Sequence, residues 1–365
     1  MSAIASLLEK PELGFDDLVA LLSVDDPDDV QRILDKGQEV KKKTVGNKVY
    51  LRGLIELSNI CRKDCLYCGI RKSNNMAVRY ALMADEVMQS ARFTYDNGFG
   101  SIVIQSGELL GEAFVKELEG YIRNIHTAFP DLLITLSCGE ESLETYRRWF
   151  DAGANRYLLR IESSQRDLYY KIHPHDAFHS FESRLQALED LRTAGYQVGT
   201  GVMIGLPWQS EAHLAHDLMF FREMDIDMVG MGPYIEHSET PLYDSRAILW
   251  PFEKRFRKSL LMIALLRIIM PTINIASTTA LETLDPKGRK KGLLAGANVV
   301  MPNVTPMAKK VNYKLYEKKS GLYTDSSASL EKVRQSIEEA GDSICFFNPG
   351  ISKHFSDRTK ERKKT

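Results

Sequence analysis

The hydrophobic and polar positions of the chain repeat in one order from about residue 49: a short run of branched residues, a polar or glycine-containing loop, then an amphipathic helix. Glycine follows several of these helices directly, as at Gly98, Gly153, Gly195 and Gly296, because it takes the left-handed conformation at a helix end without a Cβ clash. The runs typical of strands lie at 51–57, 101–105, 132–137, 156–160, 198–204, 227–231, 273–276 and 299–301. Strands that alternate with helical patterns indicate parallel βαβ units.

Eight such units predict an α/β fold, a (β/α)8 barrel of the TIM type, with a doubly wound open sheet as the alternative. The pattern assigns 1–46 to an N-terminal helical extension, 47–310 to the barrel, and 311–365 to an irregular and helical C-terminal extension. The extension ends in a charged tail, 360–365, which we expect to be disordered because it contains no apolar residue.

Charge and cysteine content narrow the classes of function. The 48 basic and 49 acidic residues give a net charge of −1, which argues against a nucleic-acid partner, since such proteins carry a basic stripe. The most apolar helical run, 260–270, is about half as long as a membrane span and contains Arg267, so we expect no membrane association. Five cysteines, three of them clustered, are not typical of a disulfide framework and predict the reducing cytoplasm.

The three clustered cysteines, Cys61, Cys65 and Cys68, follow the first predicted strand with the spacing C-x3-C-x2-C. A structural zinc ion would need a fourth cysteine or histidine at a similarly short spacing, and none follows Cys68 closely. An iron–sulfur cluster can instead be held by three thiolates, which leaves one iron open to another ligand. We therefore expect an iron–sulfur site, with zinc as the weaker alternative.

Other polar or glycine-containing residues follow the later strands. In a barrel the carboxyl ends of all strands meet at one mouth, where the active site lies. The candidates at this mouth are Ser106, Gly107, Glu108, Ser137, Cys138, Arg160, Ile161, Glu162, Thr278 and Thr279.

The cysteine spacing, with the aromatic Tyr67 just before the last cysteine, resembles the signature of the radical S-adenosylmethionine (SAM) superfamily. That resemblance implies a 4Fe-4S cluster on Cys61, Cys65 and Cys68, SAM as a second cofactor, and reductive cleavage of SAM to methionine and a 5′-deoxyadenosyl radical. Gly107–Glu108 resembles the Gly–Glu element of the superfamily, which contacts the methionine amino group. The cofactor-binding residues implied are Tyr67, Ser106, Gly107, Glu108, Ser137, Glu162 and Arg184.

A longer match, over about 15–315, resembles the HydE family of [FeFe]-hydrogenase maturases, which is related to biotin synthase and methylornithine synthase. The motifs that carry it lie at 52–59, 105–108, 156–160, 205–207, 227–233 and 296–303. By position it implies that Glu162 binds the ribose and Arg184 the methionine carboxylate. The residues expected to face the substrate are Arg160, Ile161, Cys138, Thr278, Thr279 and Tyr313, with Tyr316 a further candidate.

Two departures from the HydE pattern bear on the substrate. Ile161 stands where the family has histidine, and the loop at 307–310 is altered. The alternatives are therefore a sister radical enzyme, similar to methylornithine synthase or biotin synthase, and a non-enzymatic iron–sulfur scaffold. The expected partners are a small substrate and a reductant such as ferredoxin or flavodoxin.

The remaining cysteine and the histidines are assigned lesser roles. Cys345 is alone in the C-terminal region, so we expect no auxiliary cluster there. His173, His175 and His179 are interpreted as a solvated turn, and His237 as a residue that could reach the cavity.

Overall fold

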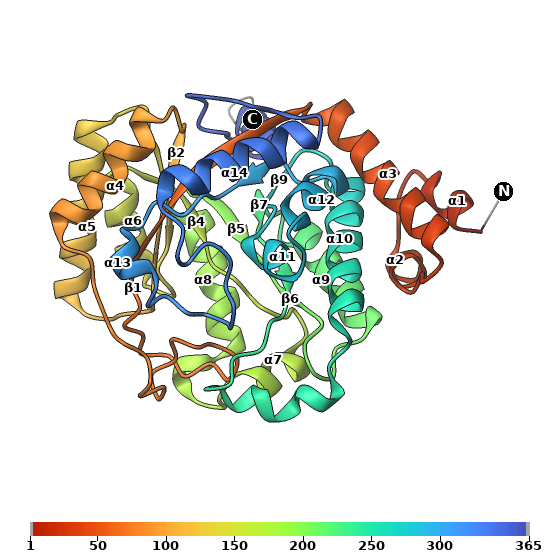
Figure 1. The fold of residues 1–365 in the computed structure, drawn as a ribbon, viewed down its shortest axis with the longest axis horizontal. Coiled ribbons are helices and arrows are strands. Elements are labelled where there is room, and N and C mark those ends of the chain that lie inside the picture. Colours follow the sequence, from red (N-terminus) through yellow and green to blue (C-terminus); the bar gives the residue numbers. More distant parts are fainter. Residues whose placement is uncertain (1–2, 363–365) are drawn as a thin grey trace.

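The computed structural model describes residues 3–362, and its elements form a parallel barrel with helices outside it (Figure 1). Three helices precede the barrel: α1 (Ala3–Leu8), α2 (Phe15–Leu22) and α3 (Pro27–Thr44). The eight strands of the ring are β1 (Lys48–Ser58), β2 (Ser101–Ser106), β3 (Leu133–Ser137), β4 (Ala154–Leu158), β5 (Gln197–Thr200), β7 (Met228–Val229), β9 (Asn274–Ile275) and β10 (Val299–Val300). Each lies within or next to a run predicted from the hydrophobic pattern.

Helices connect these strands over the outer surface. They are α4 (Ala84–Asp96), α5 (Glu112–Ala128), α6 (Leu143–Asp151), α7 (Arg166–Ile172), α8 (Phe181–Thr193), α9 (Glu211–Glu223), α10 (Phe252–Ile269), α11 (Thr279–Leu284) and α12 (Gly288–Ala295), with 3-10 turns η1 (Ala177–His179) and η2 (Pro241–Ile248). A short ladder of β6 (Met203–Ile204) with β8 (Gly232–Pro233) extends β5 and β7 toward the mouth. The last elements are α13 (Met307–Lys310), α14 (Ser326–Glu339), β11 (Ser343–Ile344) and α15 (Lys353–Arg362).

The sheet closes on itself. Its strands pair in parallel in the order β10-β1-β2-β3-β4-β5-β7-β9. The first and last strands then meet at the Ala276–Val299 bridge, where the Asn298 amide donates to the Ile275 carbonyl at 2.9 Å. This closure confirms the predicted barrel and removes the open-sheet alternative.

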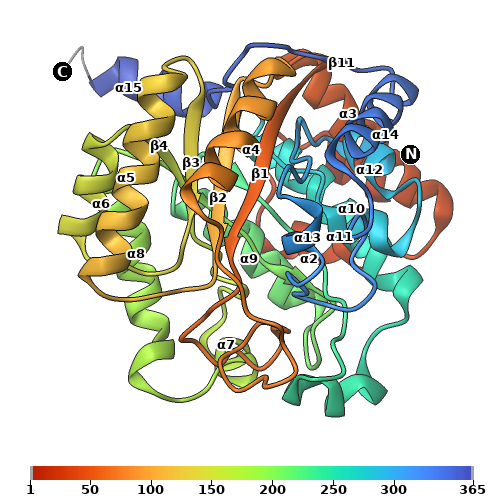
Figure 2. The ribbon, with the colours of Figure 1, turned by 60° about the vertical axis from the view of Figure 1, so that its left-hand side comes forward.

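The two extensions lie against the barrel and contact each other. Helix α3 begins with an Asp26 cap whose carboxylate accepts from the Asp28 and Asp29 amides, and it packs on α10 and α12. Near its other end, buried Lys41 pairs with Asp342, just before β11. Strand β11 pairs with the amino-terminal end of β1, on the side of the barrel away from the mouth (Figure 2).

The C-terminal tail differs from the expectation. Helix α15 continues through residue 362, so the part of the predicted disordered tail at 360–362 is helical, and 363–365 lie outside the described residues. Ion pairs stabilise this helix on the barrel: Arg358 of α15 pairs with Asp225 at 2.6 Å and with Asp227 at 2.7 Å. Within 3–362, no helix is long and apolar enough to cross a membrane.

Candidate active site

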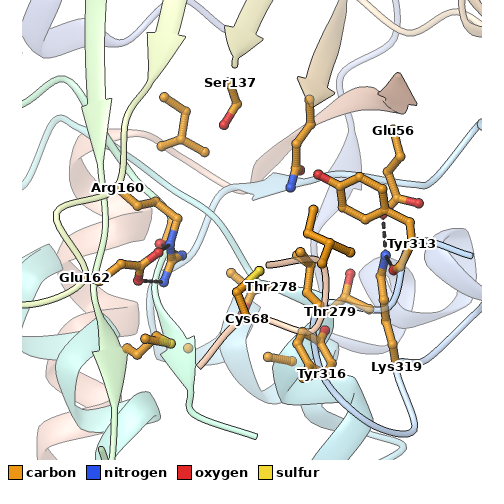
Figure 3. A pocket seen from close by; sticks show the side chains of 18 of the residues that line it. Glu56, Cys68, Ser137, Arg160, Glu162, Thr278, Thr279, Tyr313, Tyr316 and Lys319 are labelled. Atoms are coloured by element: carbon orange, nitrogen blue, oxygen red, sulfur yellow. Dashed lines mark hydrogen bonds and ion pairs between the residues drawn. The ribbon is translucent and has the colours of Figure 1, made fainter. Parts of the chain in front are cut away.

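A cavity of about 350 Å³ opens at the mouth of the barrel, a size typical of small-ligand sites (Figure 3). It brings together most of the residues predicted from the sequence. The predicted cluster and cofactor residues that line it are Cys61, Cys65, Tyr67, Cys68, Ser106, Gly107, Glu108, Ser137, Glu162 and Arg184. The predicted substrate residues that line it are Arg160, Thr278, Thr279, Tyr313 and Tyr316.

The three cysteines of the loop fit an iron–sulfur cluster better than a single ion. All three are free thiols on the wall of the same cavity. Burial and the nearby Cys61 together raise the pKa of Cys65 to about 12, so a thiolate is stable here only beside a metal. Among the described residues, no group of three or more Cys, His, Asp or Glu side chains converges as ligands of one ion. A cluster binds each thiolate through a different iron, which this loop permits.

Two histidines hold the cysteine loop, and the interpretation of this region as a solvated turn is wrong for both. His173 is buried; its Nδ1 lies 2.9 Å from the Tyr169 carbonyl, so its Nε2 accepts from the Tyr67 hydroxyl at 3.2 Å. Burial and the nearby Arg184 hold the pKa of His173 well below its usual range, so the ring is neutral. The ring of buried His179 accepts from the Asp64 amide at 2.9 Å.

Charged residues join the cysteine loop to the strand ends. Arg62 donates to Glu108 from Nε at 3.0 Å and from Nη2 at 2.7 Å, and Lys63 lies 3.4 Å from the same carboxylate. Lys63 also pairs with Glu140 at 2.9 Å, and Glu140 in turn pairs with Arg184. The network was missed from the sequence, although Arg62 and Lys63 directly follow Cys61, where cations could be expected to meet strand-end carboxylates.

Arg160 and Glu162 form an ion pair on one wall of the cavity, with Nε 2.8 Å from Oε1 and Nη2 2.8 Å from Oε2 (Figure 3). Glu162 has φ of +65°, a conformation that costs a non-glycine residue free energy and is concentrated at functional sites. The turn after it is held by Asp217, whose Oδ1 accepts from the Ser164 amide at 2.8 Å and hydroxyl at 2.6 Å.

Asp217 makes the stability of this turn depend on pH. Burial raises the pKa of Asp217 to about 7, against the two hydrogen bonds from Ser164. A raised pKa means that the folded state holds the proton more tightly than the unfolded state, so stability is lost as pH rises from about 4 to about 7. We expect Asp217→Asn, which keeps an oxygen acceptor, to raise the free energy of unfolding at pH 8 by about 2 kcal/mol. Urea denaturation of the metal-free protein at pH 5 and pH 8 measures this; equal gains at both pH values would contradict it.

The opposite wall comes from the C-terminal extension. Lys319 pairs with Glu56 of β1, donates to the Tyr313 carbonyl at 3.1 Å and lies 5.0 Å from the centre of the Tyr313 ring. Tyr316 lines the same wall. Two ion pairs therefore flank the cavity, and the sequence pattern indicated neither Glu56 nor Lys319, because nothing in it places 313–319 over the mouth.

Cys138 and Ile161 do not line the cavity, and the expectation that they face a substrate is wrong. On β3, Ser137 faces the cavity, so Cys138 points outward into the core, with its Sγ 3.6 Å from the Ile104 carbonyl. After β4, Arg160 and Glu162 face the cavity and Ile161 is fully buried in the core between them. Successive side chains in extended backbone point to opposite faces. His237 also lies outside the cavity lining, packed behind Gly69.

A buried arginine below the cavity was also missed. Arg52 on β1 lines a second cavity of about 20 Å³ in the barrel interior, and only its Nη1 has a partner, the Met228 sulfur at 3.2 Å. Burial lowers its pKa to about 10, so it stays charged at neutral pH. The alternation of side chains along β1 could have placed Arg52 inward.

Comparisons with known proteins match this fold and site. A profile described as the radical SAM superfamily matches residues 55–221. Two solved structures share the fold: methylornithine synthase (PylB) with a TM-score of 0.80 at 22% identity over 95% of this chain and 98% of that one, and the [FeFe]-hydrogenase maturase HydG from Carboxydothermus hydrogenoformans, with a TM-score of 0.77 at 21% identity over 94% and 78%. Closed barrel, three free thiols and profile together define a radical SAM enzyme.

The full length of the chain gives a narrower assignment. It is 38% identical over 340 residues to the [FeFe] hydrogenase maturase subunit HydE of Thermotoga maritima, with 93% of this chain and 94% of that protein covered. It is 26% identical to the 3-methylornithine synthase of Methanosarcina acetivorans, over 84% and 85%. The chain belongs to the HydE family of radical SAM enzymes.

The cofactors of this class are a 4Fe-4S cluster and SAM, and the three thiols with the charged and polar side chains of the cavity fit them as a donor set. When bound, they would supply an electron and a 5′-deoxyadenosyl radical formed by reductive cleavage of SAM. The Lys319–Glu56 and Arg160–Glu162 ion pairs lie in the walls of the cavity that would hold them and a small-molecule substrate. A reductant must deliver the electron from outside the barrel.

Proposed function

We propose that this enzyme acts in assembling the active-site cluster of an [FeFe] hydrogenase; its Thermotoga relative is named as an [FeFe] hydrogenase maturase subunit. The observation that carries the proposal is the 38% identity over nearly the full length of both chains. The floor of the cavity supports it: Arg52 lines a separate cavity of about 20 Å³ that shares Val103 and Leu158 with the first, and its Nε and Nη2 lack a partner. Its buried positive charge, acting without direct contact, favours an anionic ligand in the first cavity, as the cyanide of an iron complex would be.

The position of Ile161 removes one reason for a different substrate. Its side chain lies in the core behind the strand, so the change from histidine leaves the cavity wall unaltered. The second departure, at 307–310, does not include the residues of the following segment, 311–325, that line the cavity. These are Tyr313, Leu315, Tyr316 and Lys319. The hydrogenase reading is therefore favoured over a methylornithine-synthase-like or biotin-synthase-like activity.

The roles of the site residues follow from their chemistry. Cys61, Cys65 and Cys68 hold the cluster, and Tyr67 with Ser106, Gly107 and Ser137 lines the SAM site. Glu108 accepts from the methionine amino group, Arg184 pairs with the methionine carboxylate and Glu162 binds the ribose hydroxyls. In these contacts Glu108 would bind SAM as well as Arg62, and Arg184 would bind SAM as well as Glu140. Arg160, Thr278, Thr279 and Tyr313 face the substrate.

The cellular setting and the domain division complete the proposal. The electron comes from a ferredoxin or flavodoxin in the cytoplasm, where free thiols persist. The chain divides at 46 and 310 into an N-terminal extension, a barrel and a C-terminal extension whose strap, 311–325, completes the cavity wall through Tyr313 and Lys319.

Anaerobic turnover tests this function. The protein is reconstituted with iron and sulfide and incubated with dithionite and SAM, and methionine and 5′-deoxyadenosine are quantified with and without a synthetic iron cyanocarbonyl complex. We expect the complex to accelerate cleavage at least tenfold, because a bound substrate is positioned to consume the radical. Arg52→Met, which removes the buried cation and roughly keeps the volume, is expected to lose this acceleration and retain basal cleavage.

Two outcomes separate the alternatives. Acceleration by lysine, with methylornithine as the product, would contradict hydrogenase maturation in favour of the mutase. Absence of cleavage in a protein with a full cluster would favour the non-enzymatic scaffold.

A further inference from the structure

The chain that leaves the cysteine loop forms a turn, 69–74, whose carbonyl oxygens converge on one side chain, Arg79. The guanidinium group of Arg79 donates only to backbone carbonyls, from both Nη1 and Nη2. The acceptors are Asn59 and Ile70 at 2.7 Å, Arg71 at 2.6 Å, Asn74 at 3.1 Å and Lys72 at 3.5 Å. One planar donor therefore ties the residue before the cysteines to the residues after them.

Arg79 is also a partly buried cation that no carboxylate neutralises. Among the described residues Lys72 has no ion pair either, but its side chain is exposed. Arg62 pairs with Glu108 and Arg71 with Asp64, each within 2.8 Å, and Lys63 pairs with Glu140. Over the part of the chain that the structure describes, no acidic group lies within ion-pair distance of Arg79. Its positive charge is thus held by carbonyl dipoles alone, behind the loop that carries Cys68.

The other side of the same turn donates to Cys68. Burial raises the pKa of the Cys68 thiol well above its usual range, as do the neighbouring Cys65 and Cys61, and a hydrogen bond from the Ile70 amide opposes these effects. The Arg71 amide donates to the Cys68 carbonyl at 3.1 Å, and the Gly69 carbonyl accepts from the Asn74 side chain at 2.7 Å. Arg79 and Asn74 thus fix the carbonyls of the turn. Of its amides, that of Ile70 donates to the Cys68 sulfur and that of Arg71 to the Cys68 carbonyl.

This arrangement acts on the energy of an electron at the cluster. The reduction potential of an iron–sulfur cluster rises with hydrogen bonds to its sulfur ligands and with nearby positive charge, because both stabilise the more negative reduced state. A cation without a counter-ion is screened least, so its effect is larger than that of the paired Arg71. The step concerned is the transfer of one electron from an external reductant to the oxidised cluster, with no bond made or broken.

We propose that Arg79 is a positioning residue for cluster reduction: it fixes the turn that donates to Cys68, and its charge raises the midpoint potential. This inference rests on the proposed cluster ligation by Cys61, Cys65 and Cys68. It assigns to Arg79 an effect on the reductive step that starts SAM cleavage, without contact with SAM or substrate.

The test compares three variants of the full-length reconstituted protein: Arg79→Gln, Arg79→Lys and, as a matched control, Lys72→Gln. Iron and sulfide content are measured first, and the midpoint potential is then determined by redox titration followed by electron paramagnetic resonance. We expect Arg79→Gln to shift the potential negative by about 59 mV or more, which corresponds to a tenfold change in a one-electron equilibrium. Arg79→Lys keeps the charge and loses the planar fork, so its shift is smaller. Lys72→Gln removes a charge from the same turn that is exposed to water and so is screened, and its shift is smaller than that of Arg79→Gln.

A full cluster with the wild-type potential in Arg79→Gln would overturn the inference, as would an equal shift in Lys72→Gln. If Arg79→Gln fails to retain a cluster, Arg79→Lys decides: a negative shift at full iron content supports the role, and an unshifted potential overturns it. Failure of the proposed function is a different result: wild-type cleavage would then not respond to the iron cyanocarbonyl complex, while the shift in Arg79→Gln would persist.

Discussion

Replacement of Cys65 by alanine is expected to abolish reductive cleavage of SAM and leave the barrel folded. The loop that carries Cys65 lies outside the ring of strands, and the core of the barrel is formed by residues that the substitution does not contact. In the metal-free protein, burial keeps the Cys65 thiol protonated at neutral pH, with its pKa raised to about 12. Iron must displace that proton, and alanine offers no ligand to do so. Iron content should fall below the wild-type value and 5′-deoxyadenosine to background.

The matched control is Cys345→Ala. Cys345 is a free thiol whose amide donates to the Val49 carbonyl at 2.9 Å, at the opposite end of β1 from the cysteine loop. It should retain wild-type iron content and cleavage, and circular dichroism with thermal unfolding should confirm the fold of both variants. A Cys65→Ala protein that still produces 5′-deoxyadenosine would refute the assignment of the cluster.

The fold was predictable because local patterns determine it. Each barrel strand is a short branched run between a helix and a polar loop, and short parallel strands with helical connections have few ways to pair. Strands β7, β9 and β10 are each two residues long, shorter than the runs that predicted them. Strands β6 and β8 form a separate ladder toward the mouth. The pattern merged β6 with β5 in one run and placed the residues of β8 in the loop after β7.

The errors at the site share one physical cause. Cys138 and Ile161 were assigned to the cavity because they follow strands, but the face on which a side chain points depends on the parity of its position. Ser137 lines the cavity and Cys138 does not, and Arg160 and Glu162 line it while Ile161 between them does not. Parity is fixed by the whole barrel, and a one-residue difference in register exchanges the two faces.

Long-range contacts were the other part that the sequence did not reveal. Glu56 and Lys319 meet across 263 positions of the chain, and Lys63 meets Glu140 across 77. A pattern of neighbouring residues cannot predict ion pairs between such distant positions. The buried His173 was misread for the same reason, since its partner Tyr67 lies 106 positions earlier. The spacing of the cysteines predicts the ligands of a cluster, whereas the residues that hold the cysteine loop in place are found only from the packing.

Gly107→Ala is expected to reduce SAM cleavage about 100-fold, because a misplacement of about 1 Å at a reacting group costs this much. A Cβ at position 107 would lie 2.3 Å from the Ile60 carbonyl oxygen and 3.0 Å from the Cys61 Cβ. Both neighbours belong to the cysteine loop, and the Gly107 amide donates to the Ser58 carbonyl at 2.8 Å, so the strand cannot withdraw easily. The loop must therefore move, and Cys61 with it. Initial rates of 5′-deoxyadenosine formation, normalised to iron content, measure the effect.

Gly120→Ala is the matched control, because a Cβ at that position of α5 would have no atom within 4 Å. This variant should cleave SAM at the wild-type rate and be more stable by about 1 kcal/mol, since alanine favours a helix more than glycine does. Both variants add the same methyl group, so a difference between them reports the surroundings of position 107. A wild-type rate in Gly107→Ala would mean that the cysteine loop can shift from the strand end without effect, and the close approach of Gly107 to Ile60 would then have no role in positioning the cluster.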